Sequence, residues 1–144
     1  MRNLLIIGVA MFGLVLISTG CSTGDDGTPQ SLGKPAPPEE FSELTNPLVL
    51  DDSTIAAGNE LYQPNCASCH GEGGSGDGPV AQSLDPEPSD LRLSQAESTD
   101  GYLFWRIAEG GIGEPFQSSM PGWKTILTDE QIWEIIIYLR SLGG

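Results

Sequence analysis

Basic residues are scarce in this chain of 144 residues, and their scarcity excludes one class of function. Lysine and arginine together number 6 against 20 aspartates and glutamates, which gives a formal charge of −14. Nucleic acids are bound mainly through lysine and arginine, so the composition argues against nucleic acid as a partner. The 3 cysteines are too few for a disulfide framework. A single histidine leaves no pair of imidazoles for acid–base work.

Long apolar runs are also missing, apart from one near the N-terminus that has the length of a signal peptide. Residues 4–17 are apolar or small and follow Arg2, too short a run to span a bilayer comfortably. The next residues, Ser-Thr-Gly-Cys, resemble the lipobox of bacterial lipoproteins, in which the signal is cut before a cysteine that then carries lipid. Ser18 departs from that motif, which usually has an aliphatic residue there. We expect residues 1–20 to be a lipoprotein signal peptide and Cys21 to anchor the exported protein to a bacterial membrane. The alternatives are an ordinary secretory signal with a stray cysteine, or an uncleaved anchor.

Residues 21–52 have the composition of a tether. Residues 22–53 contain five prolines and seven acidic residues against one lysine, and such a segment lacks the apolar side chains needed for a core. We expect an acidic, proline-rich tether that reaches roughly 30 Å if flexible.

Residues 53–144 have the pattern of an all-α domain with three to four short helices. The first predicted helix covers 52–63, with Asp52 or Ser53 as its N-cap. The second lies within 99–111, with Thr99 or Asp100 as its cap and Gly110 as its stop. The third begins at Thr128, which forms a capping box with Gln131. Its apolar residues form one stripe: Ile132, Ile136 and Leu139, with Ile135 and Leu142 beside them. So small a helical domain commonly needs a covalent or metal staple.

The sequence Cys66-Ala-Ser-Cys69-His70 supplies that staple, because it is a C-x-x-C-H motif for covalent attachment of haem c. Cysteines three residues apart on a helical turn can each reach one vinyl group, which leaves the imidazole of His70 beneath the iron. Zinc would need a fourth ligand, and a thioredoxin-like redox pair would lie beside a βαβ pattern that is absent. The glycines of residues 71–78 keep bulky side chains away from the macrocycle.

Met120 is the candidate for the second axial ligand, since it is the only methionine after the leader. It lies in a polar, proline-flanked loop, where core packing, the commonest role of methionine, is less suited. Ligation by histidine and methionine raises the reduction potential relative to two histidines.

Residues 54–144 resemble a class I c-type cytochrome of the small, mono-haem bacterial kind. The resemblance rests on GNELYQPNCASCHGEGGSGDGP, EPSDL, YLFWRIAEGG, MPGW and LTDEQIWEIIIYLRSL. It implies the cytochrome c fold, with the first and last helices crossing near Gly58 and Tyr138. It also implies that the carbonyl of Pro79 accepts a hydrogen bond from Nδ1 of His70.

The resemblance further suggests roles for residues around the haem. Trp105 and Trp123 would line its pocket, although ordinary core aromatics are nearly as good an account of both. Three basic residues are candidates for pairing with the haem propionates, but a solvated surface role suits each of them better: Arg92, Arg106 and Lys124.

These features favour a membrane-tethered cytochrome that carries single electrons between respiratory partners, as a shuttle or as a subunit of a complex, and that is not itself an enzyme. The strong negative charge predicts membrane-bound redox partners with a basic docking face. The alternative is a haem enzyme or gas sensor with an open or labile distal site.

Overall fold

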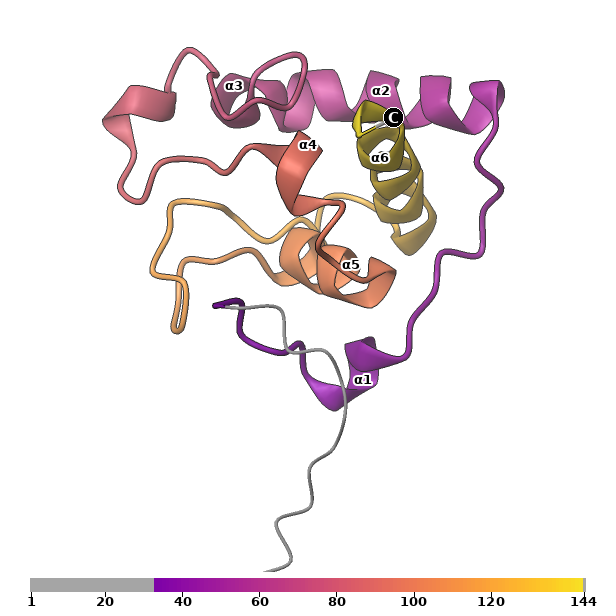
Figure 1. Cartoon of the computed structure of the whole chain (residues 1–144), viewed down its shortest axis with the longest axis horizontal. Helices are drawn as coiled ribbons and strands as arrows, with labels where there is room; N and C mark the ends of the chain where they lie inside the picture. Colours follow the sequence, from indigo (N-terminus) through magenta and orange to yellow (C-terminus); the bar gives the residue numbers. More distant parts are fainter. Residues whose placement is uncertain (1–32, 144) are drawn as a thin grey trace, which may run out of the picture.

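The structure, a computed structural model, describes residues 33–143, and this part of the chain is helical without strands (Figure 1). The elements are α1 (Glu39–Ser42), α2 (Asp52–Asn65), α3 (Ala67–His70), the 3₁₀-helix η1 (Ala81–Ser83), α4 (Leu91–Ser94), α5 (Asp100–Glu109) and α6 (Asp129–Leu142). The predicted signal peptide and Cys21 lie outside the described residues. Within 33–143, none of the helices has the length and apolar character needed to cross a membrane.

The three predicted helices form, with small corrections at the ends of α2. Its N-cap is Asp51, rather than Asp52 or Ser53, and the Asp51 side chain accepts a hydrogen bond of 2.9 Å from the N–H of Thr54. The helix also runs past Pro64 to Asn65. Proline in the last turn removes only one N–H donor, and the next donor, the N–H of Cys66, bonds normally to the Tyr62 carbonyl at 2.8 Å.

The ends of α5 and α6 are as the sequence predicts. Thr99 caps α5 by accepting a hydrogen bond from the N–H of Tyr102, and Gly110 ends the helix with a φ of 72°. Thr128 and Gln131 form both hydrogen bonds of a capping box at the start of α6.

The helices α2 and α6 cross at Gly58, as the resemblance implied. A Cβ atom on Gly58 would lie 2.1 Å from the carbonyl oxygen of Glu134 and 2.9 Å from Cβ of Tyr138. Only glycine lets the two backbones approach this closely. The crossing places the C-terminal end of α2, with the C-x-x-C-H motif, at a set position relative to α6.

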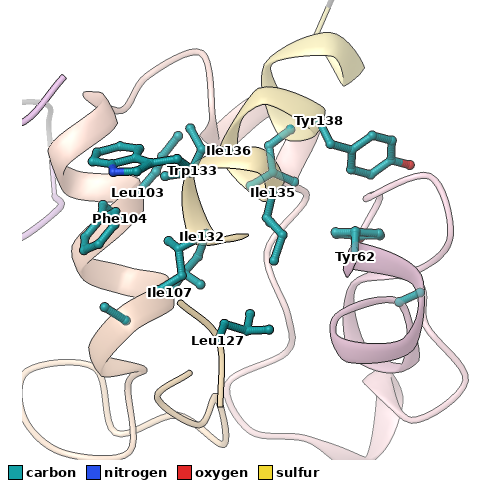
Figure 2. Close-up of a cluster of buried hydrophobic side chains, with 13 residues drawn as sticks. Tyr62, Leu103, Phe104, Ile107, Leu127, Ile132, Trp133, Ile135, Ile136 and Tyr138 are labelled. Atoms are coloured by element: carbon teal, nitrogen blue, oxygen red, sulfur yellow. The ribbon is translucent and has the colours of Figure 1, made fainter. Parts of the chain in front are cut away.

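The core lies mainly between α5 and α6. Figure 2 shows Leu103, Phe104 and Ile107 of α5 facing the buried stripe of α6. Ile132 and Ile136 are fully buried, and the rings of Phe104 and Trp133 pack with centroids 4.4 Å apart. The amphipathic pattern of α6 is thereby confirmed.

Residues 33–51 correct the prediction of a tether that extends to residue 52. This segment, called here the N-terminal strap, packs along α5 and α6, and Figure 1 shows α1 next to α5. Phe41, Leu44 and Leu48 are partly buried against the core, and the Asn46 side chain donates a hydrogen bond of 2.9 Å to the Trp133 carbonyl. Its apolar residues are too few and too irregularly spaced to form an amphipathic helix. They are sufficient to pack the strap against the surfaces of α5 and α6.

Candidate haem-binding site

The C-x-x-C-H motif lies where α2 meets α3. Cys66 is the residue between the two helices, and Cys69 and His70 complete the single turn of α3. Gly71 ends that turn with a φ of 79°, and a Cβ there would lie 2.0 Å from a carboxylate oxygen of Asp77. The left-handed conformation therefore favours glycine here, and any larger residue would also have to displace the Asp77 side chain.

Two tyrosines hold the backbone that follows the motif, a role that sequence reasoning missed. The hydroxyl of Tyr62 in α2 donates to the carbonyl of Gly71 at 2.7 Å, and that of Tyr138 in α6 donates to the carbonyl of Glu72 at 3.1 Å. The two rings pack with centroids 5.0 Å apart. The helix crossing and the loop after the motif are thus joined by one pair of side chains.

The ring of His70 is oriented by Ser89, which corrects the prediction of Pro79. Nδ1 of His70 lies 3.1 Å from the carbonyl oxygen of Ser89. Pro79 instead belongs to a segment that caps α3: the N–H groups of Gly78 and Val80 donate to the carbonyls of Cys69 and Ser68 at 3.1 and 3.2 Å. Ser89 lies in the EPSDL sequence, which was the only sequence feature that pointed to this segment. Its contact with the His70 ring depends on the fold, because 19 residues separate the two in the chain.

This hydrogen bond selects the tautomer that a metal ligand needs. A proton held on Nδ1 leaves the lone pair of Nε2 free to bind a metal. Burial lowers the pKa of His70, and the Ser89 carbonyl opposes that effect only in part. The imidazole is therefore kept neutral, which is its ligating form.

The loop that carries Met120 is attached to the end of α5. The N–H of Gly111 donates to the Met120 carbonyl at 2.9 Å, and the N–H of Trp123 donates to the carbonyl of Ile107 at 3.0 Å. A Cβ on Gly110 would lie 2.6 Å from the Met120 carbonyl oxygen and 2.4 Å from the carbonyl carbon of Pro121. Gly110 therefore both ends the helix and makes room for the methionine loop.

His70 and Met120 face the same space, although 50 residues separate them in the chain. Two cavities of about 210 and 130 Å³ adjoin each other, and both are lined by Cys66, His70, Ser89, Arg106, Met120 and Trp123. Cys69 lines the larger one. The structure brings together two thiols, a neutral imidazole and a thioether at one largely apolar hollow, the donor set that haem c requires.

Of the two predicted tryptophans, only Trp123 lines the cavities. Trp105 lies outside both linings, and its ring packs against Tyr102 and Phe116 at centroid distances of 5.8 and 5.4 Å. Trp105 is only partly buried and contacts other aromatic rings, and its place beside the haem stays a prediction. Trp105 lies on a different face of α5 from Leu103 and Ile107, which line the smaller cavity.

Arg106 also differs from its predicted surface role. It is half-buried and lines both cavities. Its guanidinium donates to the carbonyl of Gly110 at 2.5 Å, lies 3.9 Å from Sδ of Met120, and has its central carbon 3.4 Å from the ring centroid of Phe116. Arg92 and Lys124 are exposed as predicted, and each pairs with a nearby carboxylate.

The rival chemistries of the two thiols find no support in the structure. No group of three or more His, Cys, Asp or Glu within residues 33–143 is arranged to hold a metal ion. A redox dithiol acts through its thiolate, but burial and the neighbouring Cys69 raise the pKa of Cys66 to about 12.

The helical fold and this cavity define a c-type cytochrome of class I. A family model described as cytochrome c oxidase, cbb3-type, subunit III matches residues 53–139, and the chain belongs to that family. Haem c, bound covalently, is therefore its cofactor, and the residues around the cavity fit it.

Curated relatives agree with this assignment. The chain is 26% identical over 134 residues to cbb3-type cytochrome c oxidase subunit FixPc of Rhizobium leguminosarum bv. viciae. The aligned region covers 83% of this chain and 43% of the relative. The chain is also 30% identical over 101 residues to subunit FixP of Rhizobium etli, covering 70% of this chain and 32% of the relative. The chain thus spans less than half the length of these relatives.

A solved structure supports the fold. A chain of the reducing HAO-like protein complex of Kuenenia stuttgartiensis is similar to this one with a TM-score of 0.57 and 28% identity, over 68% of this chain and 47% of that chain.

Proposed function

We propose that this protein is a mono-haem cytochrome c that carries single electrons at a bacterial membrane and is not itself an enzyme. The observation that carries the proposal is the shared cavity lined by Cys66, Cys69, His70 and Met120. In this proposal the two cysteines hold the haem, and His70 and Met120 are the axial ligands.

The chemistry follows from what these side chains do. Bound haem supplies an iron centre that exchanges one electron. The Ser89 carbonyl would hold the proton on Nδ1 of His70, which leaves the lone pair of Nε2 free, and burial favours the neutral imidazole. Gly110 and Gly111 hold the Met120 loop against α5. His70 and Met120 would together hold the iron and so would compete with oxygen or peroxide for it, which favours a carrier over an enzyme or gas sensor.

The protein is proposed to be exported and held by lipid on Cys21, at the outer face of the cytoplasmic membrane or on its periplasmic side. Because the strap is docked from Lys34 onward, only residues 22–33 separate Cys21 from the folded part. Twelve residues span at most about 40 Å when fully extended. The haem domain would then work within about 40 Å of the membrane surface, a confinement that raises its effective concentration for membrane-bound partners.

The proposed partners are membrane-bound redox proteins with a basic docking face. This protein would reach them either as a free shuttle or as a subunit fixed in a respiratory complex. The named relatives are subunits of cbb3-type oxidases, which favours the second arrangement. Four of the five basic residues in the described part pair with carboxylates: Lys34 with Glu97, Arg92 with Asp90, Lys124 with Glu109 and Arg140 with Asp100. The surface field is therefore set by the many remaining acidic residues.

Haem staining and optical spectra test the proposal. Haem stain should survive a denaturing gel for the wild type and weaken for Cys66→Ser and Cys69→Ser. Met120→Ala should lose the weak far-red sulfur–iron band, lower the midpoint potential and bind carbon monoxide. Gln117→Ala is a matched control, because Gln117 is exposed in the same loop and lines neither cavity. If the spectra of Met120→Ala are unchanged, Met120 does not bind the iron in the wild type. That result would contradict the proposed ligation and favour an enzyme or gas sensor.

Membrane attachment needs its own test. Cys21→Ser, expressed behind a cleavable signal, should move the cytochrome to the soluble exported fraction, because lipid chains contribute about 0.8 kcal/mol per buried CH₂. Wild-type protein found wholly in the soluble fraction would contradict the lipid anchor.

Purification in mild detergent, followed by identification of co-purifying proteins, distinguishes a fixed subunit of a complex from a free shuttle.

A further inference from the structure

Lys34, in the N-terminal strap, lines the smaller cavity together with Cys66, His70 and Met120. Its ammonium donates to the Ser94 carbonyl at 3.2 Å and to the Ser98 hydroxyl at 3.1 Å. The side chain of Lys34 is 26% exposed. A residue from the segment predicted to be a free tether thus forms part of the cofactor cavity.

Fixed positive charge is rare around the two cavities. Apart from His70, their linings include two basic residues, Lys34 and Arg106, and one acidic residue, Glu87. Haem carries two propionate carboxylates, and a carboxylate that enters an apolar hollow needs a cation or several donors. The guanidinium of Arg106 is already engaged by the Gly110 carbonyl, the Phe116 ring and Met120. Lys34 has two neutral oxygen partners and one carboxylate, Glu97, which is 3.7 Å away and 70% exposed.

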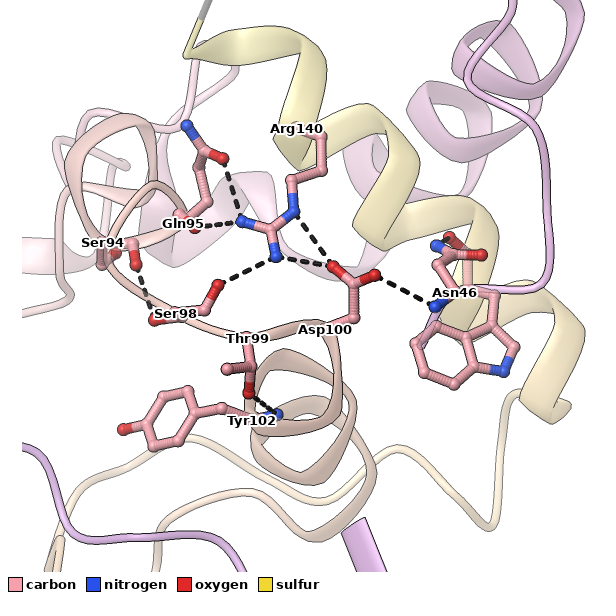
Figure 3. Close-up of polar contacts among 9 residues, drawn as sticks. Asn46, Ser94, Gln95, Ser98, Thr99, Asp100, Tyr102 and Arg140 are labelled. Carbon is pink, nitrogen blue, oxygen red and sulfur yellow. Dashed lines mark hydrogen bonds and ion pairs between the residues drawn. The ribbon is translucent and has the colours of Figure 1, made fainter. Parts of the chain in front are cut away.

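Specific contacts hold the strap in place. Figure 3 shows Asn46 beside Asp100, whose carboxylate accepts a hydrogen bond of 3.0 Å from the Asn46 N–H. Arg140 of α6 binds the same carboxylate at 2.6 Å and the Ser98 carbonyl at 2.9 Å. One polar cluster therefore joins the strap, the start of α5 and the end of α6.

Glycine at position 101 also makes room for the strap. A Cβ on Gly101 would lie 1.9 Å from the carbonyl oxygen of Phe41 and 3.2 Å from that of Leu44. The Phe41 ring packs against Phe104, with centroids 6.2 Å apart. The strap thus follows one path along α5, and that path ends with Lys34 at the cavity.

We propose that the N-terminal strap closes the haem cavity and that Lys34 pairs with a haem propionate, which raises the reduction potential. The inference rests on the proposed function, because it requires haem in this cavity. A cation beside a propionate offsets negative charge that would otherwise favour ferric over ferrous iron. Removal of Lys34 should therefore lower the midpoint potential.

Redox titration of the full-length holoprotein tests the pairing. Lys34→Gln should lower the midpoint potential, and Lys34→Arg should restore most of the wild-type value. Lys124→Gln is the matched control, because it removes the same charge from an exposed lysine that lines neither cavity. A shift in Lys34→Gln no larger than that in Lys124→Gln overturns the inference. Wild-type protein without covalent haem would instead be a failure of the proposed function.

Displacement of the strap provides a second test that leaves Lys34 in the chain. Gly101→Ala should speed proteolytic cleavage within residues 35–50 and lower the midpoint potential in the same direction as Lys34→Gln. The Lys34→Gln change should then have little further effect in the double variant. Gly113→Ala is the control, because a Cβ there meets no atom within 4 Å. A strap that is cleaved faster while the potential stays at the wild-type value would show that the strap does not close the cavity.

Discussion

The helix crossing at Gly58 offers a quantitative test of the fold, because two effects of one methyl group oppose each other there. Glycine to alanine in a helix interior normally stabilises by about 1 kcal/mol. In Gly58→Ala, however, the new Cβ would lie 2.1 Å from the Glu134 carbonyl oxygen, roughly 1 Å inside normal contact. Overpacking typically costs about 1–3 kcal/mol and occasionally more. The contact is between the backbones of two packed helices, which cannot move apart easily, so we take an overpacking cost of about 3 kcal/mol. After the gain in helix propensity is subtracted, the free energy of unfolding should fall by about 2 kcal/mol.

Guanidinium and thermal unfolding of the holoprotein, followed by circular dichroism, measure this loss. A destabilisation of about 2 kcal/mol lowers Tm by about 10 °C in a domain of this size. Ala56→Gly, at an exposed site of the same helix, is the reference and should cost about 1 kcal/mol through helix propensity alone. Gly58→Ala protein as stable as the wild type, or more stable, would refute the close crossing.

Three further predictions concern the methionine loop, acid stability and partner encounter. Gly110→Ala should weaken the sulfur–iron band while haem stays covalent, because a Cβ at φ 72° would lie 2.6 Å from the Met120 carbonyl; an intact band would contradict this. Burial would raise the pKa of Asp100, but hydrogen bonds from Arg140 and from the Asn46 N–H lower it overall. Its contribution to stability should therefore be present above the unfolded pKa of about 4 and be lost as pH falls through the lower folded value. Asp100→Asn should flatten the loss of stability between about pH 5 and pH 2, as measured by denaturant titration, and an unchanged profile would contradict the pairing. Electron exchange with a membrane-bound partner should slow as salt rises from about 10 mM to several hundred mM, because the Debye length falls from roughly 30 Å to below 10 Å; a flat or rising rate would favour an apolar or permanent interface.

The sequence by itself determined the features whose causes lie within one or two helical turns. The capping box at Thr128, the apolar stripe of α6 and the stop at Gly110 depend on neighbours three or four residues away. The C-x-x-C-H motif is equally local, since α3 places Cys69 and His70 one turn after Cys66. These features indicated an all-α haem protein before any contact between distant residues was known.

Only the tertiary structure decided which distant residues meet at the cavity. Ser89 rather than Pro79 orients His70, because the Pro79 segment is taken up in capping α3. Arg106 lines the cavity, although the sequence favoured a solvated surface role for it as strongly as for Arg92 and Lys124.

The strap shows the physical reason most clearly. Its proline-rich, acidic composition carries no periodicity and predicts a free tether. Its docking depends on surfaces that exist only after α5 and α6 have packed: the gap above Gly101, the carboxylate of Asp100 and the Trp133 carbonyl. Local composition reports what a segment can form alone, whereas its place in the fold depends on partners that the rest of the chain provides.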